Sequence, residues 1–330
     1  MKDARQTLTL TIGKITLRVR GQGLEWIAKV YDGFVSNATH HHGLLELRQV
    51  ARRNTPLPAN IRKEARKFPA YFKHKFFAYD DLQKPRLAED DLLCLFADNF
   101  FRKVFFHYKE NSATNYLFVM SRSVIFFDPG KGKAYLFLFK DDPDSLKDGQ
   151  KEAALYFLFP KLAIFHGGLF LHSAGVLSSR KAYLFVGKSG SGKSTITKKS
   201  GGRTILSDDV VGIQRHNGRF DAFATPWGTY RRKMQSRHLR GPLHSVFFLH
   251  KDSKFSLQRL KSSEAIIKSL PPTLSRYTTE PEFRLTFELL SKLFTRYPAW
   301  DMHSSKEQDI WEYVSTKKGG GHGKTQDHSG

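Results

Sequence analysis

A glycine-rich run near the middle of the chain holds the residues with the clearest capacity for chemistry. Residues 187–194 read Gly-Lys-Ser-Gly-Ser-Gly-Lys-Ser and satisfy the P-loop pattern G-x-x-x-x-G-K-S/T in full. Glycines in such a run let backbone N–H groups turn inward around phosphate oxygens. Lys193 supplies a cation for the β and γ phosphates, and the Ser194 hydroxyl is a ligand for Mg²⁺. The pattern predicts a site for ATP and Mg²⁺ formed by Gly187, Lys188, Ser189, Gly190, Ser191, Gly192, Lys193, Ser194 and Thr195.

Two adjacent carboxylates follow this run closely. Asp208 and Asp209 come 15 and 16 residues after Lys193, at the end of an apolar stretch that predicts a strand. One carboxylate can bind Mg²⁺ while the other takes a proton from an attacking hydroxyl. A polar turn between strands is the alternative, which the nearby P-loop makes the weaker one. Side chains of neighbouring strand residues point to opposite faces, so the residues alone leave open which aspartate is the base.

His172 is a third candidate, in the run Leu-His-Ser-Ala-Gly-Val that ends 11 residues before Gly187. A lone histidine in an apolar strand is most often a core residue. A strand that ends near the phosphates would instead aim it at the γ phosphate or at the incoming hydroxyl. The candidate catalytic residues are therefore Asp208, His172 and Lys193, and the candidate metal ligands are Ser194 and Asp209.

Apolar patterning predicts the elements that would position these residues. A helix at 151–165 is expected first. Strands are then expected at 169–176, 182–186, 203–206 and 210–214, with a short helix at 195–199. Further along, we expect 245–250 and 255–259 to pair as strands, and helices at 262–270, 282–294 and 308–314. The order is that of an α/β fold.

The first 150 residues have a different pattern. Alternation of polar and apolar residues predicts two strands, 7–12 and 14–19, joined at Gly13. Helices at 24–34 and 91–106 and strands at 116–120, 124–127 and 133–139 are also expected, around an irregular basic region at 51–90. A charged, proline-containing stretch at 141–150 marks a boundary. We expect a variable α+β domain for substrate recognition at 1–150, a catalytic domain at 151–316 and a disordered tail at 317–330.

Composition narrows the classes of function. The net charge of +23 attracts nucleic acid, anionic membranes or acidic proteins. Its lysines and arginines are spread along the chain with no nucleic-acid motif beside them, which favours a basic, solvated surface. The expected partner is a protein or peptide substrate with an acceptor hydroxyl, for which an acidic sequence is one option, and nucleic acid is not expected. Cys94 is the single cysteine, which excludes an intramolecular disulfide. The apolar run 155–177 contains Pro160 and a Gly-Gly pair, which favours a buried helix and a strand over a membrane span. Without an apolar signal-peptide core near Met1, we expect a cytoplasmic protein.

Three of these segments together resemble the catalytic domain of the bacterial HPr kinase/phosphorylase family. They are LHSAGV around His172, GKSGSGKS at 187–194 and SDDVV at 207–211, in that order and at close spacing. The segment Thr-Pro-Trp-Gly at 225–228 is also similar to that family, and the resemblance is specific over residues 169–270. It implies a P-loop kinase core of the HPr kinase and phosphoenolpyruvate carboxykinase type, with an α+β N-terminal domain.

The resemblance also implies roles for the residues. Asp208 would be the catalytic base, Asp209 and Ser194 would lie near Mg²⁺, and His172 would match the family's active-site histidine. The chain lacks the Glu/Asp-Val-Arg-Gly signature of the bifunctional enzymes, as do related kinases that phosphorylate the C-terminal serine of lasso-peptide precursors. The implied activity is transfer of the γ phosphate of ATP to a hydroxyl, most plausibly serine of a small protein or peptide. The relatives also imply a homo-oligomer.

Two other functions stay open at this point. One is a nucleotide-binding regulatory or assembly module with slow or no ATP hydrolysis, against which the pair of aspartates argues, since a module that only binds needs no base. The other is a carboxykinase-like enzyme acting on a small acid, whose additional metal ligands and acid-binding arginines have no evident counterparts in the chain.

Overall fold

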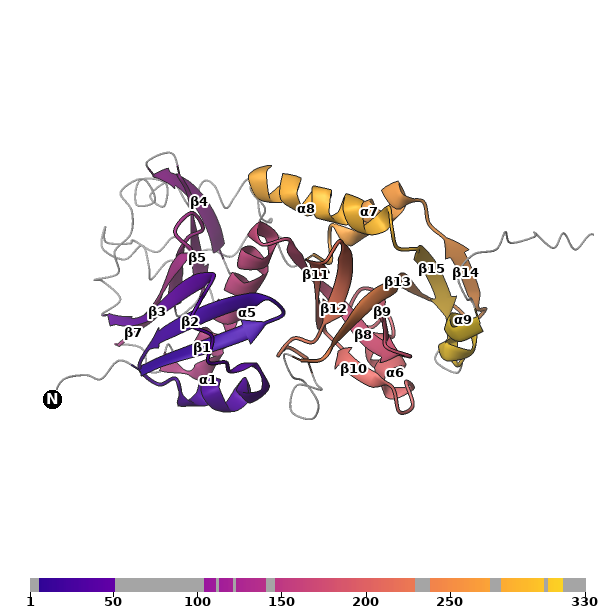
Figure 1. Cartoon of the computed structure of the whole chain (residues 1–330), viewed down its shortest axis with the longest axis horizontal. Coiled ribbons are helices and arrows are strands. Elements are labelled where there is room, and N and C mark those ends of the chain that lie inside the picture. The colour runs from indigo at the N-terminus through magenta and orange to yellow at the C-terminus, as the bar shows by residue number, and fades with distance from the viewer. Residues whose placement is uncertain are drawn as a thin grey trace, which may run out of the picture.

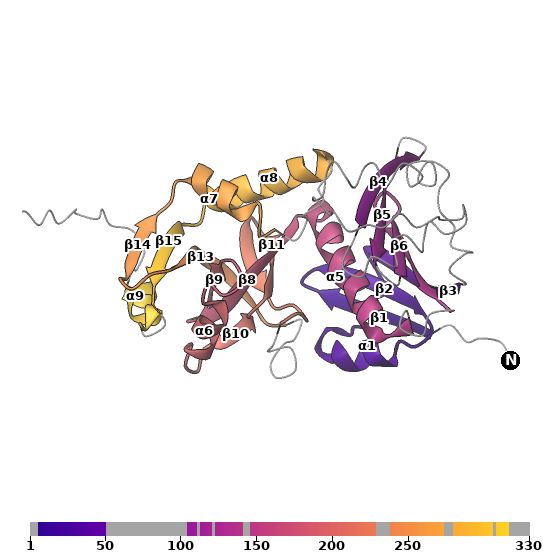
Figure 2. The ribbon, with the colours of Figure 1, turned by 180° about the vertical axis from the view of Figure 1, so that it is seen from behind.

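The computed structural model describes residues 6–50, 104–110, 113–120, 123–140, 146–228, 238–273, 280–305 and 308–316. Over these residues the chain has a mixed α/β fold built on a seven-stranded and an eight-stranded sheet. Figures 1 and 2 show the two sheets side by side, with the long helix α5 between them.

The first sheet belongs to the N-terminal part of the chain and has the strand order β1-β2-β3-β7-β6-β5-β4. Its strands are β1 (Gln6–Ile12), β2 (Ile15–Gly21), β3 (Gly43–Val50), β4 (Val104–Glu110), β5 (Ala113–Met120), β6 (Ser123–Asp128) and β7 (Lys133–Phe139). The predicted hairpin at Gly13 is confirmed: β1 and β2 are antiparallel, and Gly13 has the left-handed φ of 63° that its turn requires.

Some expectations for this region were wrong and others lie outside the described residues. The predicted helix 91–106 ends in strand β4, because residues 104–106 pair antiparallel with β5. Consecutive aromatic and β-branched side chains suit such a ladder. Strand β3 had no predicted counterpart. Cys94, residues 51–103, residues 141–145 and the tail 317–330 lie outside the described residues.

Three helical segments cover the first sheet. Two are short, α1 (Glu25–Val30) and a 3₁₀ turn (Asp32–Phe34), and the third is the long helix α5 (Asp148–Phe165). Apolar residues of α5 share one core with strands β1, β2, β6 and β7. As predicted, the run 155–177 forms a buried helix followed by a strand. No helix in the described part of the chain is both long and apolar enough to cross a membrane.

The second sheet carries the residues for which the sequence predicts chemistry. Its strands are β8 (Gly168–Ser178), β9 (Lys181–Val186), β10 (Thr204–Ser207), β11 (Val210–His216), β12 (Arg219–Phe223), β13 (Arg240–Lys251), β14 (Ser256–Arg259) and β15 (Ala299–Ser304). Strand β9 pairs with both β8 and β13, so β8, β11, β12, β13 and β9 close on one another. The expected pairing of 245–250 with 255–259 is wrong, because β15 lies between β13 and β14 and pairs with both.

Four helices complete the C-terminal part: α6 (Lys193–Lys198), α7 (Ser262–Ser269), α8 (Glu280–Phe294) and α9 (Ile310–Thr316), close to the predicted positions. Helices α7 and α8 share a core with the second sheet, while α6 and α9 contribute to a separate cluster on its other side. The boundary near residue 150 stays a prediction; α5 begins at Asp148 and contacts elements on both sides of it.

A buried ion pair joins α5 to α8. Lys161 Nζ lies 2.8 Å from Glu282 Oε2, with the two side chains 2% and 0% exposed. The same ammonium lies 5.0 Å from the ring centroid of Tyr116 on β5, a cation–π distance. Burial lowers the pKa of Lys161, and the Glu282 carboxylate opposes that shift. One charged contact therefore joins elements of both parts of the chain.

Aromatic side chains extend the N-terminal core into the second sheet. Trp227 packs edge-to-face on Phe159 of α5, at 6.2 Å between ring centroids, and on Phe170 of β8, at 5.7 Å. The tip of the β1–β2 hairpin lies over Phe223 of β12, so closely that a Cβ at Gly13 would come within 2.6 Å of the ring. The two sheets thus share buried apolar surface.

Candidate functional site

The glycine-rich loop, residues 187–194, follows the buried strand β9 and includes the first two residues of helix α6, Lys193 and Ser194. Gly190 and Gly192 have φ angles of 78° and 107°, a region that side-chain-bearing residues rarely adopt. Gly187 is required for a different reason, because a Cβ at this position would lie 2.3 Å from Ser191 Oγ. The glycines thus allow a tight backbone turn that larger residues would distort.

Lys193 is held inside this loop. Its side chain is buried, and its Nζ donates hydrogen bonds to the carbonyl oxygens of Gly187 at 2.7 Å and Lys188 at 3.0 Å. Burial lowers the pKa of the Lys193 ammonium, while the carboxylates of Asp209 and Asp208 act in the opposite direction. Both aspartates therefore lie within electrostatic reach of the lysine.

An unsatisfied hydroxyl in the loop suits an anionic ligand. Ser191 Oγ is buried and has no hydrogen-bond partner among the described residues. Leaving a buried hydroxyl unpaired costs free energy, so such groups usually have a protein, water or ligand partner. A phosphate oxygen near the loop would accept this hydrogen bond. The residues present therefore fit the triphosphate that the sequence pattern predicts.

Strand register brings the loop and the aspartates to the same part of the second sheet. On one side of β8, Ser173 pairs with Val186, the last residue before the loop. On the other side, His172 pairs with Val210, the first residue after the aspartates. The loop and the aspartates thus emerge from the two neighbours of one strand, about 10 Å apart at ordinary strand spacing.

A serine fixes the backbone around the aspartates. Asp208 and Asp209 form a bend between β10 and β11, and Ser207 precedes them. The Ser207 hydroxyl donates to the Trp227 carbonyl at 2.7 Å and accepts the N–H groups of Asp209 at 3.2 Å and Val210 at 3.1 Å. Sequence reasoning did not single out Ser207, although a serine directly before a two-residue polar bend is a recognised signal for such side-chain to backbone bonds.

The two carboxylates have different surroundings. Asp208 is buried, at 6% exposure, whereas the Asp209 side chain is 41% exposed. His172 Nδ1 lies 3.2 Å from Asp209 Oδ1. The histidine that sequence analysis aimed at the γ phosphate or at a hydroxyl thus contacts Asp209. This contact can fix the orientation of the Asp209 carboxylate.

Gly228 closes the site against Asp208. Its φ is 119°, and a Cβ there would lie 2.5 Å from Asp208 Oδ1 and 3.0 Å from Ser207 Oγ. Both the backbone angle and the space available therefore require glycine. The sequence showed Gly228 only as part of the Thr-Pro-Trp-Gly segment, with no indication that it touches the aspartate.

We expect the Gly228→Ala variant to lose about 1–3 kcal/mol of stability. The added methyl group must displace a buried carboxylate in addition to straining the backbone. Gly192→Ala is the matched control, since its φ of 107° is similar and no atom lies within 4 Å of the added Cβ. Thermal unfolding of the two variants separates the cost of the contact with Asp208 from the cost of the backbone strain. Equal losses in Tm would mean that the contact with Asp208 has no energetic importance.

The predicted magnesium ligands, Ser194 and Asp209, are more exposed than Lys193 and Asp208. Ser194 is exposed at the start of α6, and Asp209 is partly exposed beside His172. Among the described residues, no group of three or more His, Cys, Asp or Glu side chains is arranged to hold a metal ion. Mg²⁺ in phosphoryl-transfer sites takes one or two protein ligands and completes its shell with phosphates and water. Ser194 and Asp209 are of the right chemical type for that arrangement.

Comparisons with known proteins give limited information. No family model matches the chain, and no curated protein matches it. Among solved structures, the Hpr(Ser) kinase/phosphatase from Coxiella burnetii matches with a TM-score of 0.27 and 8% sequence identity, covering 44% of this chain and 86% of that one. A TM-score of this size is too low to define a shared fold.

Proposed function

We propose that this chain is an ATP-dependent kinase that transfers the γ phosphate to a hydroxyl, serine of a small protein or peptide being the preferred acceptor. One observation supports the proposal: the register of β8 with its neighbours brings the glycine-rich loop and two aspartates together, and both carboxylates oppose the effect of burial on the pKa of Lys193. A phosphoryl-transfer site needs this combination of a phosphate-binding loop, a cation and a carboxylate base.

The loop residues would bind and orient the triphosphate. The Lys193 ammonium, which now bonds to the carbonyls of Gly187 and Lys188, would turn to the β and γ phosphates. Ser191 would donate its unpartnered hydroxyl to a phosphate oxygen. Ser194 and Asp209 would hold Mg²⁺, which would neutralise charge on the β and γ phosphates.

Asp208 would act on the acceptor. Its carboxylate takes the proton of the acceptor hydroxyl as the new oxygen–phosphorus bond forms and the bond to the departing ADP breaks. Gly228 lies directly against this carboxylate, and the Ser207 hydrogen bonds hold the backbone of the bend that carries it. His172 orients Asp209 through the 3.2 Å contact. We assign this chemistry to residues 151–316 and the recognition of the acceptor to residues 1–150.

Calorimetric titration of the whole chain with ATP and Mg²⁺ tests the binding half of this proposal. Lys193→Ala is expected to weaken binding about 10- to 100-fold, because it removes a charge-assisted contact with the phosphates. Lys198→Ala, at an exposed position on the same helix, removes the same charge and serves as the control. Unchanged affinity in Lys193→Ala, or an equal loss in both variants, would contradict the assignment of the loop.

Phosphate transfer requires a second measurement. The chain is incubated with labelled ATP, Mg²⁺ and a panel of serine-containing peptides that includes acidic ones, and phosphopeptide is detected directly. The proposal expects label on at least one peptide with the wild type and none with Lys193→Ala. Tight ATP binding without transfer to any acceptor would instead favour the regulatory or assembly module.

A further inference from the structure

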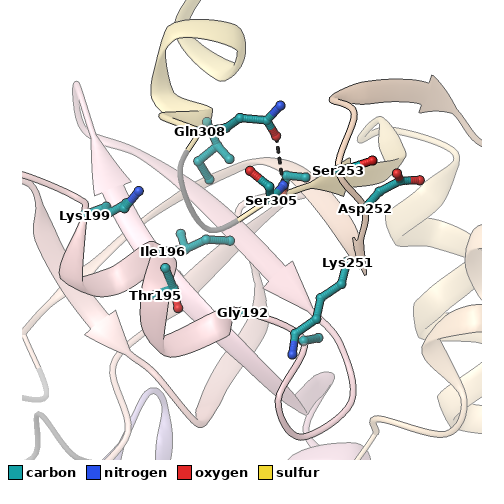
Figure 3. A pocket seen from close by; sticks show the side chains of 12 residues that line it. Gly192, Thr195, Ile196, Lys199, Lys251, Asp252, Ser253, Ser305 and Gln308 are labelled. Atoms are coloured by element: carbon teal, nitrogen blue, oxygen red, sulfur yellow. Dashed lines mark hydrogen bonds between the residues drawn. The ribbon is translucent and has the colours of Figure 1, made fainter.

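A cavity of about 400 Å³ adjoins the glycine-rich loop. One wall is formed by Ser191 and Gly192 of the loop with Thr195 and Ile196 of α6. The opposite wall comes from the segments that follow β13 and β15 (Figure 3). Its volume lies in the range of sites that bind small molecules and cofactors.

The residues that line the cavity differ from those proposed for phosphoryl transfer. Its lining includes Gly192 and Thr195, but none of His172, Lys193, Asp208 and Asp209. A ligand whose terminal phosphate meets Lys193 and the aspartates would therefore extend its other end into this cavity. An acceptor hydroxyl would have to approach from the side of Asp208.

The lining combines an apolar surface with hydrogen-bonding groups. Ile196 and Ile310 are buried residues that present apolar side chains to the cavity. Ser253, Ser304 and Gln308 contribute polar groups, and the Ser305 N–H donates to Gln308 Oε1 at 2.8 Å (Figure 3). That bond fixes the orientation of the Gln308 amide. Apolar faces with a few fixed polar groups suit a flat heterocycle joined to a polyhydroxyl ring.

A second cation reaches the loop across the cavity. Lys251 is the last residue of β13, and its side chain extends toward Gly192 (Figure 3). It is exposed, so its ammonium group loses few protein contacts by turning to a ligand. A phosphate next to the nucleoside would lie at this end of the cavity. Lys251 is therefore placed to contact it opposite Lys193.

We infer that this cavity is the nucleoside subsite: it takes the base and ribose of the nucleoside triphosphate, with Lys251 binding the phosphate nearest the ribose. This inference rests on the proposed function, because the loop must first hold the phosphates. It adds residues from β13, β15 and the segment before α9 to a site that the sequence pattern confined to residues 172–209.

Two ligands distinguish binding at the glycine-rich loop from binding in the cavity. Inorganic tripolyphosphate with Mg²⁺ engages only the loop, whereas ATP with Mg²⁺ engages both. We expect the wild-type chain to bind ATP more tightly than tripolyphosphate in calorimetric titration. Ser304→Phe and Ser253→Phe place an aromatic ring in the cavity. Each is expected to weaken ATP binding at least about tenfold and to leave tripolyphosphate binding unchanged. Retained tripolyphosphate binding also reports that the variant is folded.

A matched pair of variants tests the role of Lys251. Lys251→Ala is expected to weaken ATP binding several-fold, while Lys254→Ala, an exposed lysine three residues further along that does not line the cavity, should have no effect. ATP affinity that stays at the wild-type value in both phenylalanine variants, or falls together with that of tripolyphosphate in both, would overturn the nucleoside subsite. A wild-type chain that binds neither ligand would instead overturn the proposed function, and the subsite with it.

Discussion

Lys161→Met is expected to destabilise the chain by about 3–5 kcal/mol, the largest loss of stability that we expect from a single substitution. The lysine and Glu282 are 2% and 0% exposed, and their charged groups are 2.8 Å apart. Methionine has a similar length and fills the same apolar surroundings. It leaves the Glu282 carboxylate buried without its counter-charge, and water cannot replace the lost partner at that depth.

The double variant Lys161→Met/Glu282→Leu identifies the cause. Removing both charges together is expected to restore most of the stability, since well-packed apolar residues often replace a buried ion pair without loss. Arg284→Met breaks an exposed pair with Glu280 on the same helix, where the side chains are 76% and 81% exposed, and should change stability little. Denaturant unfolding followed by tryptophan fluorescence gives all four values. A double variant as unstable as the single one would show that packing, rather than the unpaired carboxylate, is responsible.

Asp208→Asn is expected to reduce the rate of phosphate transfer about 10²- to 10⁴-fold, the contribution usual for a positioned general base. Asparagine has nearly the same shape, so the contact with Gly228 is kept, but it cannot take the proton of the acceptor hydroxyl. ATP affinity should change little, because the Lys193 ammonium and the backbone of the loop remain. Single-turnover transfer and calorimetric titration measure the two quantities separately.

Asp209→Asn should give a different result. Its proposed partner is Mg²⁺, so this variant is expected to need more Mg²⁺ for ATP binding, and the rate at saturating Mg²⁺ should fall less than in Asp208→Asn. Glu288→Gln, an exposed carboxylate on α8 that pairs with Lys292, is the control for loss of a negative charge. If Asp209→Asn lost the greater part of the transfer rate and Asp208→Asn lost little, the two assignments would have to be exchanged.

Local patterns predicted most elements of the second sheet, but not how distant strands pair. Residues 245–250 and 255–259 have clear strand character, and their closeness in sequence favoured a hairpin. In the structure β15 separates them, although it follows β14 by about forty residues and has only six residues. A strand of six residues, Ala-Trp-Asp-Met-His-Ser, in which three residues are polar, gives little periodic signal. It is stabilised by long-range pairing that no local pattern contains.

For the candidate site, too, local patterns predicted some parts and not others. The loop and the aspartates were proposed from residue type and spacing, because phosphate binding constrains consecutive residues. The cavity could not be predicted, since it is assembled from the ends of β13 and β15 and the start of α6, more than fifty residues apart. The contact between Gly228 and Asp208 was also invisible, because it depends on a backbone angle and a side-chain position twenty residues away.

The apolar surface that α5 shares with both sheets has a consequence for the history of this protein. A cut at residue 150 would leave the N-terminal strands without the side chains of α5 that complete their core, and would leave Trp227 without Phe159. The N-terminal region therefore cannot be exchanged for another without changes in α5. A chimaera that carries a foreign N-terminal region should therefore also carry the donor's α5, including the residues that contact Trp227. During evolution, substitutions in α5 and in the surface around Trp227 would have to occur together.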